Sequence, residues 1–180
     1  GIQIDLAAGT SAYGTGGDTF SSIEKVIGTT WKDAFHIVNG GTAIGGGHDD
    51  LFQGDYAGST SETFQGDAGN DQFFLYANVK GTTHAADVIA DFVNGQDLLV
   101  IDTTNFWAGA GLDKTQPFGG ALLTFNADGL PNGIVAPQFV YGGGKLYFSA
   151  NGDPASGSII VAEFLGNIGG QLAQSDFAFI

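Results

Sequence analysis

The sequence predicts an all-β protein, in which a short parallel β-roll is capped by a C-terminal antiparallel β-sheet. Glycine makes up 31 of the 180 residues, against a usual share of about 7%. There is no collagen period, so these glycines are expected in turns. A polar-to-apolar pattern recurs about every nine residues in the first half of the chain. In the second half, apolar runs alternate with turn residues, which is typical of antiparallel strands.

The clearest copy of the repeat is residues 66–74, Gly-Asp-Ala-Gly-Asn-Asp-Gln-Phe-Phe. It fits the nonapeptide G-G-x-G-x-D-x-U-x, where U is a large apolar residue, except that Asp67 replaces the second glycine. In this pattern six residues form a tight turn, for which glycine supplies the backbone freedom, and three form a strand. The pattern predicts that Asp71 points into the turn and Phe73 into the core.

The turn-and-strand pattern repeats along residues 24–76 as an acidic or polar residue, any residue and an apolar residue. The members are Glu24-Lys25-Val26, Asp33-Ala34-Phe35, Thr42-Ala43-Ile44, Asp50-Leu51-Phe52, Glu62-Thr63-Phe64 and Asp71-Gln72-Phe73. Their first residues, at 24, 33, 42, 50, 62 and 71, are separated by 9, 9, 8, 12 and 9 positions. Since one nonapeptide cannot bury its own apolar face, the series predicts stacked coils.

Two nonapeptides make one coil, so successive turns are expected on alternate sides of the roll. One side would stack Asp33, Asp50 and Asp71, and the other Glu24, Thr42 and Glu62. Stacked carboxylates repel unless a cation lies between them, and a set of oxygen ligands suits Ca²⁺. The aspartate side is therefore the predicted calcium site, and the other side is expected to be degenerate and bare.

The remaining elements follow in chain order. Residues 1–13 are expected to form a lead-in strand and turn, because apolar residues alternate there. Trp31 is expected to pack in the core, and residues 98–101 to form a buried strand. Residues 139–141, 145–149 and 159–164 are expected to form an antiparallel sheet. The chain thus divides into residues 1–78, the lead-in strands and calcium-binding roll, and residues 79–180, the C-terminal cap.

These motifs resemble the repeats-in-toxin (RTX, hemolysin-type) calcium-binding proteins. The resemblance rests mainly on the 66–74 nonapeptide and on residues 87–102, which are similar to the segment that follows such rolls. Residues 1–30 are similar to the lead-in, and residues 139–177 to the C-terminal domain of type I secretion substrates. The chain departs from the pattern at His48, Thr42, Glu62 and residues 54–65, which leaves the number of calcium ions open.

The resemblance implies both a ligand set and an export signal. Carboxylates after the roll help to close the last coil in this family, which adds residues near 91–97 to the site. The candidate metal ligands are Asp33, Asp50, Asp67, Asp71, Asp91 and Asp97. The candidate secretion motif is Asp176, Phe177, Ala178, Phe179 and Ile180. A terminal edge strand is the alternative for that last segment.

Composition excludes several functions. The net charge of −14, with five basic residues, argues against nucleic acids and anionic membrane surfaces, because both need basic patches. There is no cysteine, so calcium is expected to take the place of the disulfides that stabilise many secreted domains. No apolar run in these residues is long enough to span a bilayer, and export is not expected to depend on an N-terminal signal sequence. No zinc spacing, nucleophile elbow or phosphate loop is present, so the chain is not expected to be an enzyme.

The predicted function is that of a bacterial, secreted, non-catalytic RTX module. It would fold on extracellular calcium and engage the type I secretion machinery through its C-terminus, as the resemblance implies. Two alternatives stay open. One is a stand-alone extracellular or cell-surface protein that self-assembles, or joins a larger surface complex, through calcium bridges. The other is an accessory module of a secreted enzyme, such as a protease or an alginate epimerase.

Overall fold

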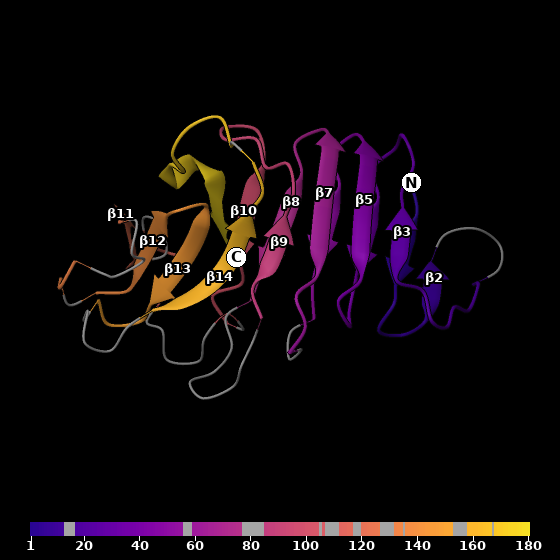
Figure 1. The fold of residues 1–180 in the computed structure, drawn as a ribbon, viewed down its shortest axis with the longest axis horizontal. Helices are drawn as coiled ribbons and strands as arrows, with labels where there is room; N and C mark the ends of the chain where they lie inside the picture. The colour runs from indigo at the N-terminus through magenta and orange to yellow at the C-terminus, as the bar shows by residue number, and fades with distance from the viewer. Residues whose placement is uncertain are drawn as a thin grey trace.

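Two β-sheets make up almost all of the regular structure (Figure 1). The computed structural model describes residues 1–180 except 13–16, 56–58, 77–84, 105, 107–111, 117–119, 127–131, 135, 153–157 and 167. Helix is limited to short 3-10 turns such as η3 (Gln174–Asp176). The all-β prediction is therefore confirmed, and both sheets are mixed. No helix in the described ranges is long and apolar enough to cross a membrane.

One sheet, sheet A, has seven strands, and the other, sheet B, has eight. Sheet A has the order β15 (Phe177–Phe179), β10 (Leu98–Ile101), β8 (Gln72–Leu75), β6 (Leu51–Gln53), β4 (Ala34–His36), β1 (Gln3–Asp5) and β2 (Thr10–Ala12). Sheet B has the order β11 (Leu122–Phe125), β12 (Gln138–Gly142), β13 (Lys145–Ser149), β14 (Ile159–Phe164), β9 (Asp87–Ile89), β7 (Thr63–Ala68), β5 (Thr42–Gly47) and β3 (Lys25–Ile27). Among these strands, β1 pairs antiparallel with β2, and β13 pairs antiparallel with both β12 and β14. The other neighbouring strands pair in parallel.

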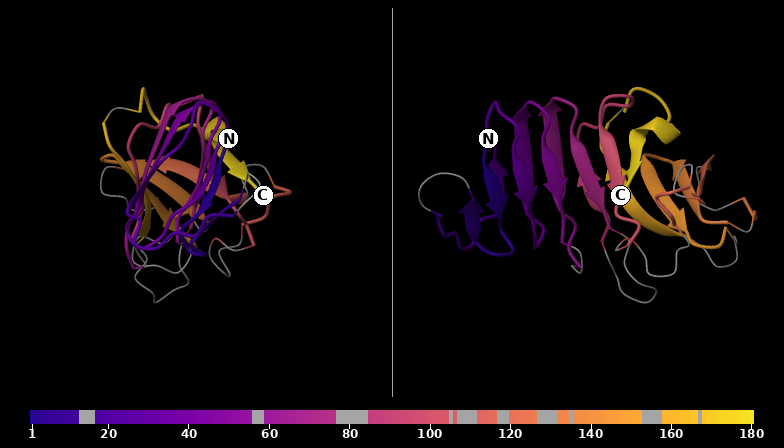
Figure 2. Two further views of the ribbon diagram at one scale, coloured as in Figure 1. Left: turned by 90° about the vertical axis from the view of Figure 1, so that its right-hand side faces the viewer. Right: turned by 180° about the vertical axis from the view of Figure 1, so that it is seen from behind.

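From β3 to β10 the chain alternates between the two sheets, and each strand pairs in parallel with the strand two places later. The left view in Figure 2, along the long axis of the molecule, shows the two sheets and the turns that join them. Sheet A places Ala34, Leu51, Gln72 and Leu98 side by side. Subtracting these residue numbers gives coils of 17, 21 and 26 residues. The coils therefore lengthen toward the C-terminal cap.

Phenylalanine fills the space between the sheets. The ring of Phe52 stacks on those of Phe35 and Phe73, with centroids 5.3 and 5.1 Å apart. Phe64 reaches the same ring from the opposite sheet at 5.6 Å. All four side chains are buried, because each occupies the inward position of its strand. The predicted inward direction of Phe73 is confirmed.

Two expectations within the repeats are wrong. The parallel register pairs Lys25 with Thr42 and Val26 with Ala43, so Ala43 points inward and is fully buried, whereas Ile44 is only partly buried. Thr42 therefore lies one residue too late to match Glu24. Trp31 is 66% exposed rather than in the core, because it lies in the turn between β3 and β4.

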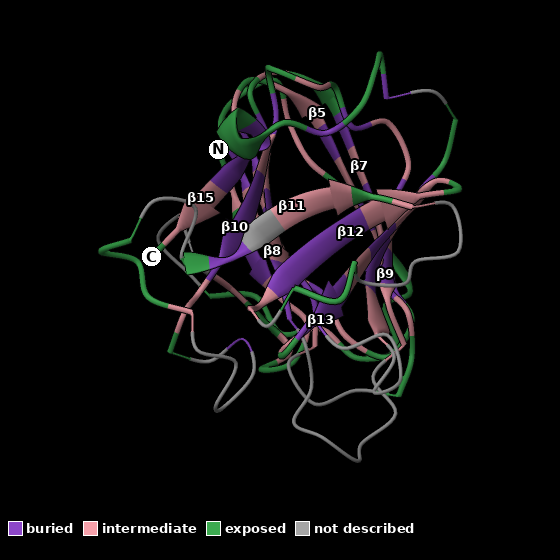
Figure 3. Cartoon of the chain, turned by 90° about the vertical axis from the view of Figure 1, so that its left-hand side faces the viewer, coloured by how far each residue is buried: buried purple, intermediate pink, exposed green. Residues whose placement is uncertain are grey.

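The C-terminal third forms the expected sheet. Strands β12, β13 and β14 pair antiparallel in sequence. β14 then pairs in parallel with β9, and β11 pairs in parallel with β12, so this sheet continues sheet B. Figure 3 shows β10 and β12 largely buried at this end. The predicted boundary between residues 78 and 79 lies outside the described residues.

Candidate metal site

Four aspartates form a buried row along one edge of the molecule, where the chain passes from sheet B to sheet A. Asp33, Asp50, Asp71 and Asp97 each lie immediately before a strand of sheet A, and the register of those strands sets them side by side. All four side chains are buried. We call this set the aspartate row.

One oxygen of each carboxylate connects neighbouring coils. The Asp33 N–H donates to Asp50 Oδ1 at 2.7 Å, and the Asp50 N–H donates to Asp71 Oδ1 at 2.8 Å. The Asp71 N–H donates to Asp97 Oδ1 at 3.0 Å. At the first coil, the Ile2 N–H donates to Asp33 Oδ1. Each turn thus satisfies one backbone donor of the coil before it, which explains why an acidic residue recurs at this place in the repeat.

The second oxygens differ from one coil to the next. Asp33 Oδ2 accepts the N–H and the hydroxyl of Thr29, and Asp97 Oδ2 accepts the Val93 N–H at 2.8 Å. Asp50 Oδ2 is buried and has no hydrogen-bond partner among the described residues. A buried carboxylate oxygen that lacks a donor is costly and unusual in a folded protein. At this oxygen, the described residues therefore supply no hydrogen-bond donor.

Glycines make room beside these oxygens. Gly28, Gly45 and Gly66 each precede an aspartate of the row by five positions. A Cβ at Gly28 would lie 2.5 Å from Asp33 Oδ2, and a Cβ at Gly45 would overlap Asp50 Oδ2 and lie 2.7 Å from the Gly66 carbonyl oxygen. The first glycine of the repeat thus allows carboxylate and turn carbonyl oxygens to approach one another.

The row is short of positive charge. Burial raises the pKa of Asp50 to about 6 and the pKa of Asp71 to about 7, and neighbouring carboxylates of the row raise both. Backbone hydrogen bonds act in the opposite direction, and Lys32 lowers the pKa of Asp50. Burial also raises the pKa of Asp97. Holding these carboxylates close together therefore costs free energy, and protonation or a bound cation would lower this cost.

The six predicted ligands do not all lie in the row. Asp91 is adjacent to it and accepts the N–H groups of Gly66 and Asp67, each at 2.8 Å. Asp67 is exposed, has a left-handed backbone with φ of 64°, and accepts the Gln65 amide at 2.6 Å. The structure therefore brings four of the six predicted ligands together in the aspartate row. Asp91 binds the turn that precedes Asp71, and Asp67 lies at the surface.

Three further acidic residues are buried and accept backbone N–H groups, but they were not predicted as metal ligands. Asp176, assigned to the export motif, is fully buried and accepts the N–H groups of Gly95 and Ala173 at 2.9 and 2.7 Å. On the opposite edge, Glu62 and Asp87 are buried side by side, although that side was expected to be degenerate. The triplet Asp87-Val88-Ile89 follows the same rule as Asp71-Gln72-Phe73, so extending the search past residue 74 finds it.

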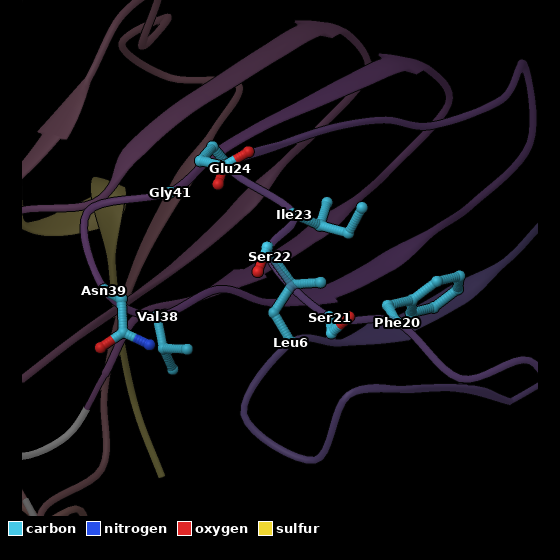
Figure 4. A pocket seen from close by; sticks show the side chains of 9 residues that line it. All are labelled: Leu6, Phe20, Ser21, Ser22, Ile23, Glu24, Val38, Asn39 and Gly41. Atoms are coloured by element: carbon cyan, nitrogen blue, oxygen red, sulfur yellow. The ribbon is translucent and has the colours of Figure 1, made fainter.

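A pocket of about 190 Å³ lies at the N-terminal end, away from the aspartate row (Figure 4). Apolar side chains and short polar ones line it together, and Glu24 is the titratable residue among them. Ser22 and Asn39, on its wall, both have positive φ. The lining supplies too few charged groups to form a metal site of its own.

Among the described residues, no three histidine or acidic side chains surround a common point. No protein-family model and no curated protein sequence matches this chain.

Proposed function

We propose that the chain is a non-catalytic calcium-binding module of the RTX type, whose parallel β-roll folds on Ca²⁺ outside the bacterial cell. The observation that carries this proposal is the aspartate row, with Asp50 Oδ2 buried and unpartnered at its centre. Such an oxygen fits a cation ligand better than it fits a structural hydrogen-bond acceptor.

The donor set favours calcium over other metals. Ca²⁺ takes six to eight oxygen ligands and accepts backbone carbonyls together with carboxylates. Asp33, Asp50, Asp71 and Asp97 would supply carboxylate oxygens, and the carbonyls of Gly45 and Gly66 lie beside them. Bound calcium would supply the positive charge that the row lacks. Asp91 would hold the turn that carries the Gly66 carbonyl.

Calcium dependence would couple folding to the place where the protein functions. Without a cation, like charges in the row oppose stacking of the coils, and the glycine-rich turns lose much conformational entropy on ordering. Extracellular modules bind calcium at roughly 10⁻⁴–10⁻³ M. A site filled at 100 times its dissociation constant adds about 2.7 kcal/mol to stability, so a few sites would decide whether the chain folds.

The C-terminal segment fits an export signal that is read before folding. Residues 176–180 form or flank β15, which pairs in parallel with β10, so the edge-strand interpretation holds in the folded state. In an unfolded chain the same segment would be accessible to the type I secretion machinery. The signal and the strand would then be two states of one segment.

Circular dichroism in excess chelator and in millimolar calcium tests the proposal. We expect β structure and a cooperative melting transition with calcium, and a largely unfolded spectrum without it. A matched pair of variants localises the effect. Gly45→Ala would push a methyl group into Asp50 Oδ2, whereas a methyl group at Gly47 would make only ordinary contact with Thr30 at 3.7 Å. Neither glycine has positive φ, so backbone strain does not distinguish them.

Gly45→Ala should weaken the response to calcium, and Gly47→Ala should retain it. The proposal fails if the wild-type spectrum and melting temperature are the same in chelator and in calcium.

A further inference from the structure

Two carboxyl groups are buried against each other on the edge opposite the aspartate row. Glu62 immediately precedes β7, and Asp87 is the first residue of β9; the pairing of Thr63 with Val88 sets the two side by side. These strands are neighbours in the middle of sheet B (Figure 1). Glu62 is 0% exposed and Asp87 is 2% exposed. Neither carboxyl group can therefore rely on water to stabilise a charge.

Backbone N–H groups donate to both carboxyl groups, including a long hydrogen bond from the Asp55 N–H to Glu62 Oε2 at 3.4 Å. Asp87 Oδ1 accepts the Glu62 N–H at 3.0 Å, and Glu62 Oε1 accepts the Gly40 N–H at 3.0 Å. The other two oxygens both face Gly54, where a Cβ would lie 2.5 Å from Asp87 Oδ2 and 3.3 Å from Glu62 Oε2. These two oxygens therefore lie on the same side of the pair, where a hydrogen bond between the carboxyl groups would raise the pKa of Asp87.

A hydrogen bond between two carboxyl groups requires a proton on one of them, because an ionised carboxylate can only accept. The part of the chain that the structure describes offers no positive charge in its place. The charged groups that act on Asp87 are Glu62 and Asp55, both acidic. At the same level of the sheet the neighbouring strands contribute Gly41 and Ala162. Burial raises the pKa of Asp87 well above its ordinary value, and Glu62 raises it further.

We propose that Glu62 and Asp87 share one proton at neutral pH and form a pH-sensitive lock between β7 and β9. The two edges of the molecule would then relieve the same charge problem differently, one with a cation and the other with a proton. The lock does not depend on calcium binding by the aspartate row. Gly54 is needed there because any side chain would enter the space beside Asp87 Oδ2 and Glu62 Oε2.

The direction of the pH effect follows from the raised pKa. The unfolded chain releases the Asp87 proton near pH 3.9, whereas the folded chain keeps it to a higher pH. The lock is therefore strongest in acid, and its contribution to stability is lost as the pH rises toward the folded pKa. While only the folded state holds the proton, the unfolding equilibrium constant rises by roughly tenfold per pH unit.

Asp87→Asn tests the lock, because the amide copies the protonated carboxyl group. Its oxygen can still accept the Glu62 N–H, and its NH₂ group can donate to Glu62. We expect the variant to fold and to lose the part of the pH dependence that one proton supplies. Denaturant unfolding should be measured from acid to alkaline pH, both in chelator with a stabilising osmolyte and in saturating calcium. Asp18→Asn, at an exposed carboxylate, is the charge-matched control and should retain the wild-type slope.

Infrared spectroscopy of the wild-type protein gives a direct readout that needs no variant. A protonated-carboxyl C=O band should be present in the folded protein at neutral pH in saturating calcium and absent from Asp87→Asn. An absent band in the wild type overturns the lock. So does equal pH dependence in Asp87→Asn and the wild type, or the loss of one bound calcium ion in Asp87→Asn. If the aspartate row binds no calcium, the wild type and Asp87→Asn should still differ in the pH dependence of their unfolding.

Discussion

At Asp50 the two carboxylate oxygens have opposite environments. Oδ1 accepts the Asp33 N–H at 2.7 Å and connects two coils, whereas no described residue donates a hydrogen bond to Oδ2. The Asp50 side chain therefore stabilises the fold through the hydrogen bond at Oδ1 and destabilises it through the buried Oδ2. The balance between the two effects should depend on whether a cation is bound, and one substitution separates them.

Asp50→Asn should change stability in opposite directions with and without calcium. The amide oxygen retains the bond to the Asp33 N–H, and the neutral side chain removes a buried charge, so we expect stability in chelator to stay equal or to rise by about 1–3 kcal/mol. In calcium the variant should lose a ligand and melt below the wild type. Melting curves in calcium and in chelator with a stabilising osmolyte measure the effect, with Asp18→Asn as the control. Equal calcium stabilisation of Asp50→Asn and the wild type would exclude Asp50 as a ligand.

At the scale of elements, the strands of the coils depend on the stack of phenylalanine rings. Phe52 lies between Phe35 and Phe73 in sheet A and also contacts Phe64 of sheet B. It therefore connects three successive strands of one sheet to the other sheet. Its contribution should not depend on the metal, because the ring is inside the coil and the aspartate row lies at the turns.

Phe52→Ala should destabilise the protein by about 3–5 kcal/mol, the usual cost of a buried phenylalanine cavity. We expect this loss in saturating calcium, where the fold is most stable, and the number of bound ions should stay the same if the variant folds. Phe125→Ala, on the edge strand β11, removes a ring that is 47% exposed and should have a much smaller effect. Denaturant unfolding of both variants compares them directly. A loss below about 1 kcal/mol for Phe52→Ala would contradict this packing.

The sequence patterns were informative where side chain and turn repeat together. The triplets that end in Phe35, Phe52 and Phe73 predicted both the aspartate row and the inward rings, because the acid and the apolar residue lie two positions apart in every coil. The Thr42 triplet failed because Ala43 and Ile44 are both apolar, so polarity alone could not fix the register. No triplet could show that Asp50 Oδ2 lacks a donor, since that depends on residues from three coils.

On the scale of the whole molecule, acidic side chains connect the coils by hydrogen bonds and also make the stability of the fold depend on pH. Asp50 and Asp71 have folded pKa values of about 6 and about 7, above the ordinary value of about 3.9. The folded protein therefore holds these protons more tightly than the unfolded chain. Protons and calcium should act as alternative ways to neutralise the same row.

Calcium-free protein should accordingly become more stable as the pH falls from about 7 to about 4, and lose that stability as the pH rises again. Each raised group contributes up to roughly a tenfold change in the unfolding equilibrium constant per pH unit. Saturating calcium should flatten this part of the dependence, because the bound ion favours the ionised carboxylates. Melting temperatures across this range, in chelator with a stabilising osmolyte and in calcium, provide the measurement. Calcium-free stability that rises with pH would contradict the sign.

The register of sheet A also has a consequence for protein synthesis. Leu99 of β10 pairs with Phe73 on one side and with Phe177 on the other, so its second neighbour lies 78 residues further along the chain (177 − 99). At 5–20 residues per second, a ribosome needs roughly 4 to 16 s to make that distance. During this interval a nascent chain that had already wound its first coils would present the bare edge of β10 to other chains, and unpaired edges recruit foreign strands. A chain that remains unwound until it is complete avoids this hazard.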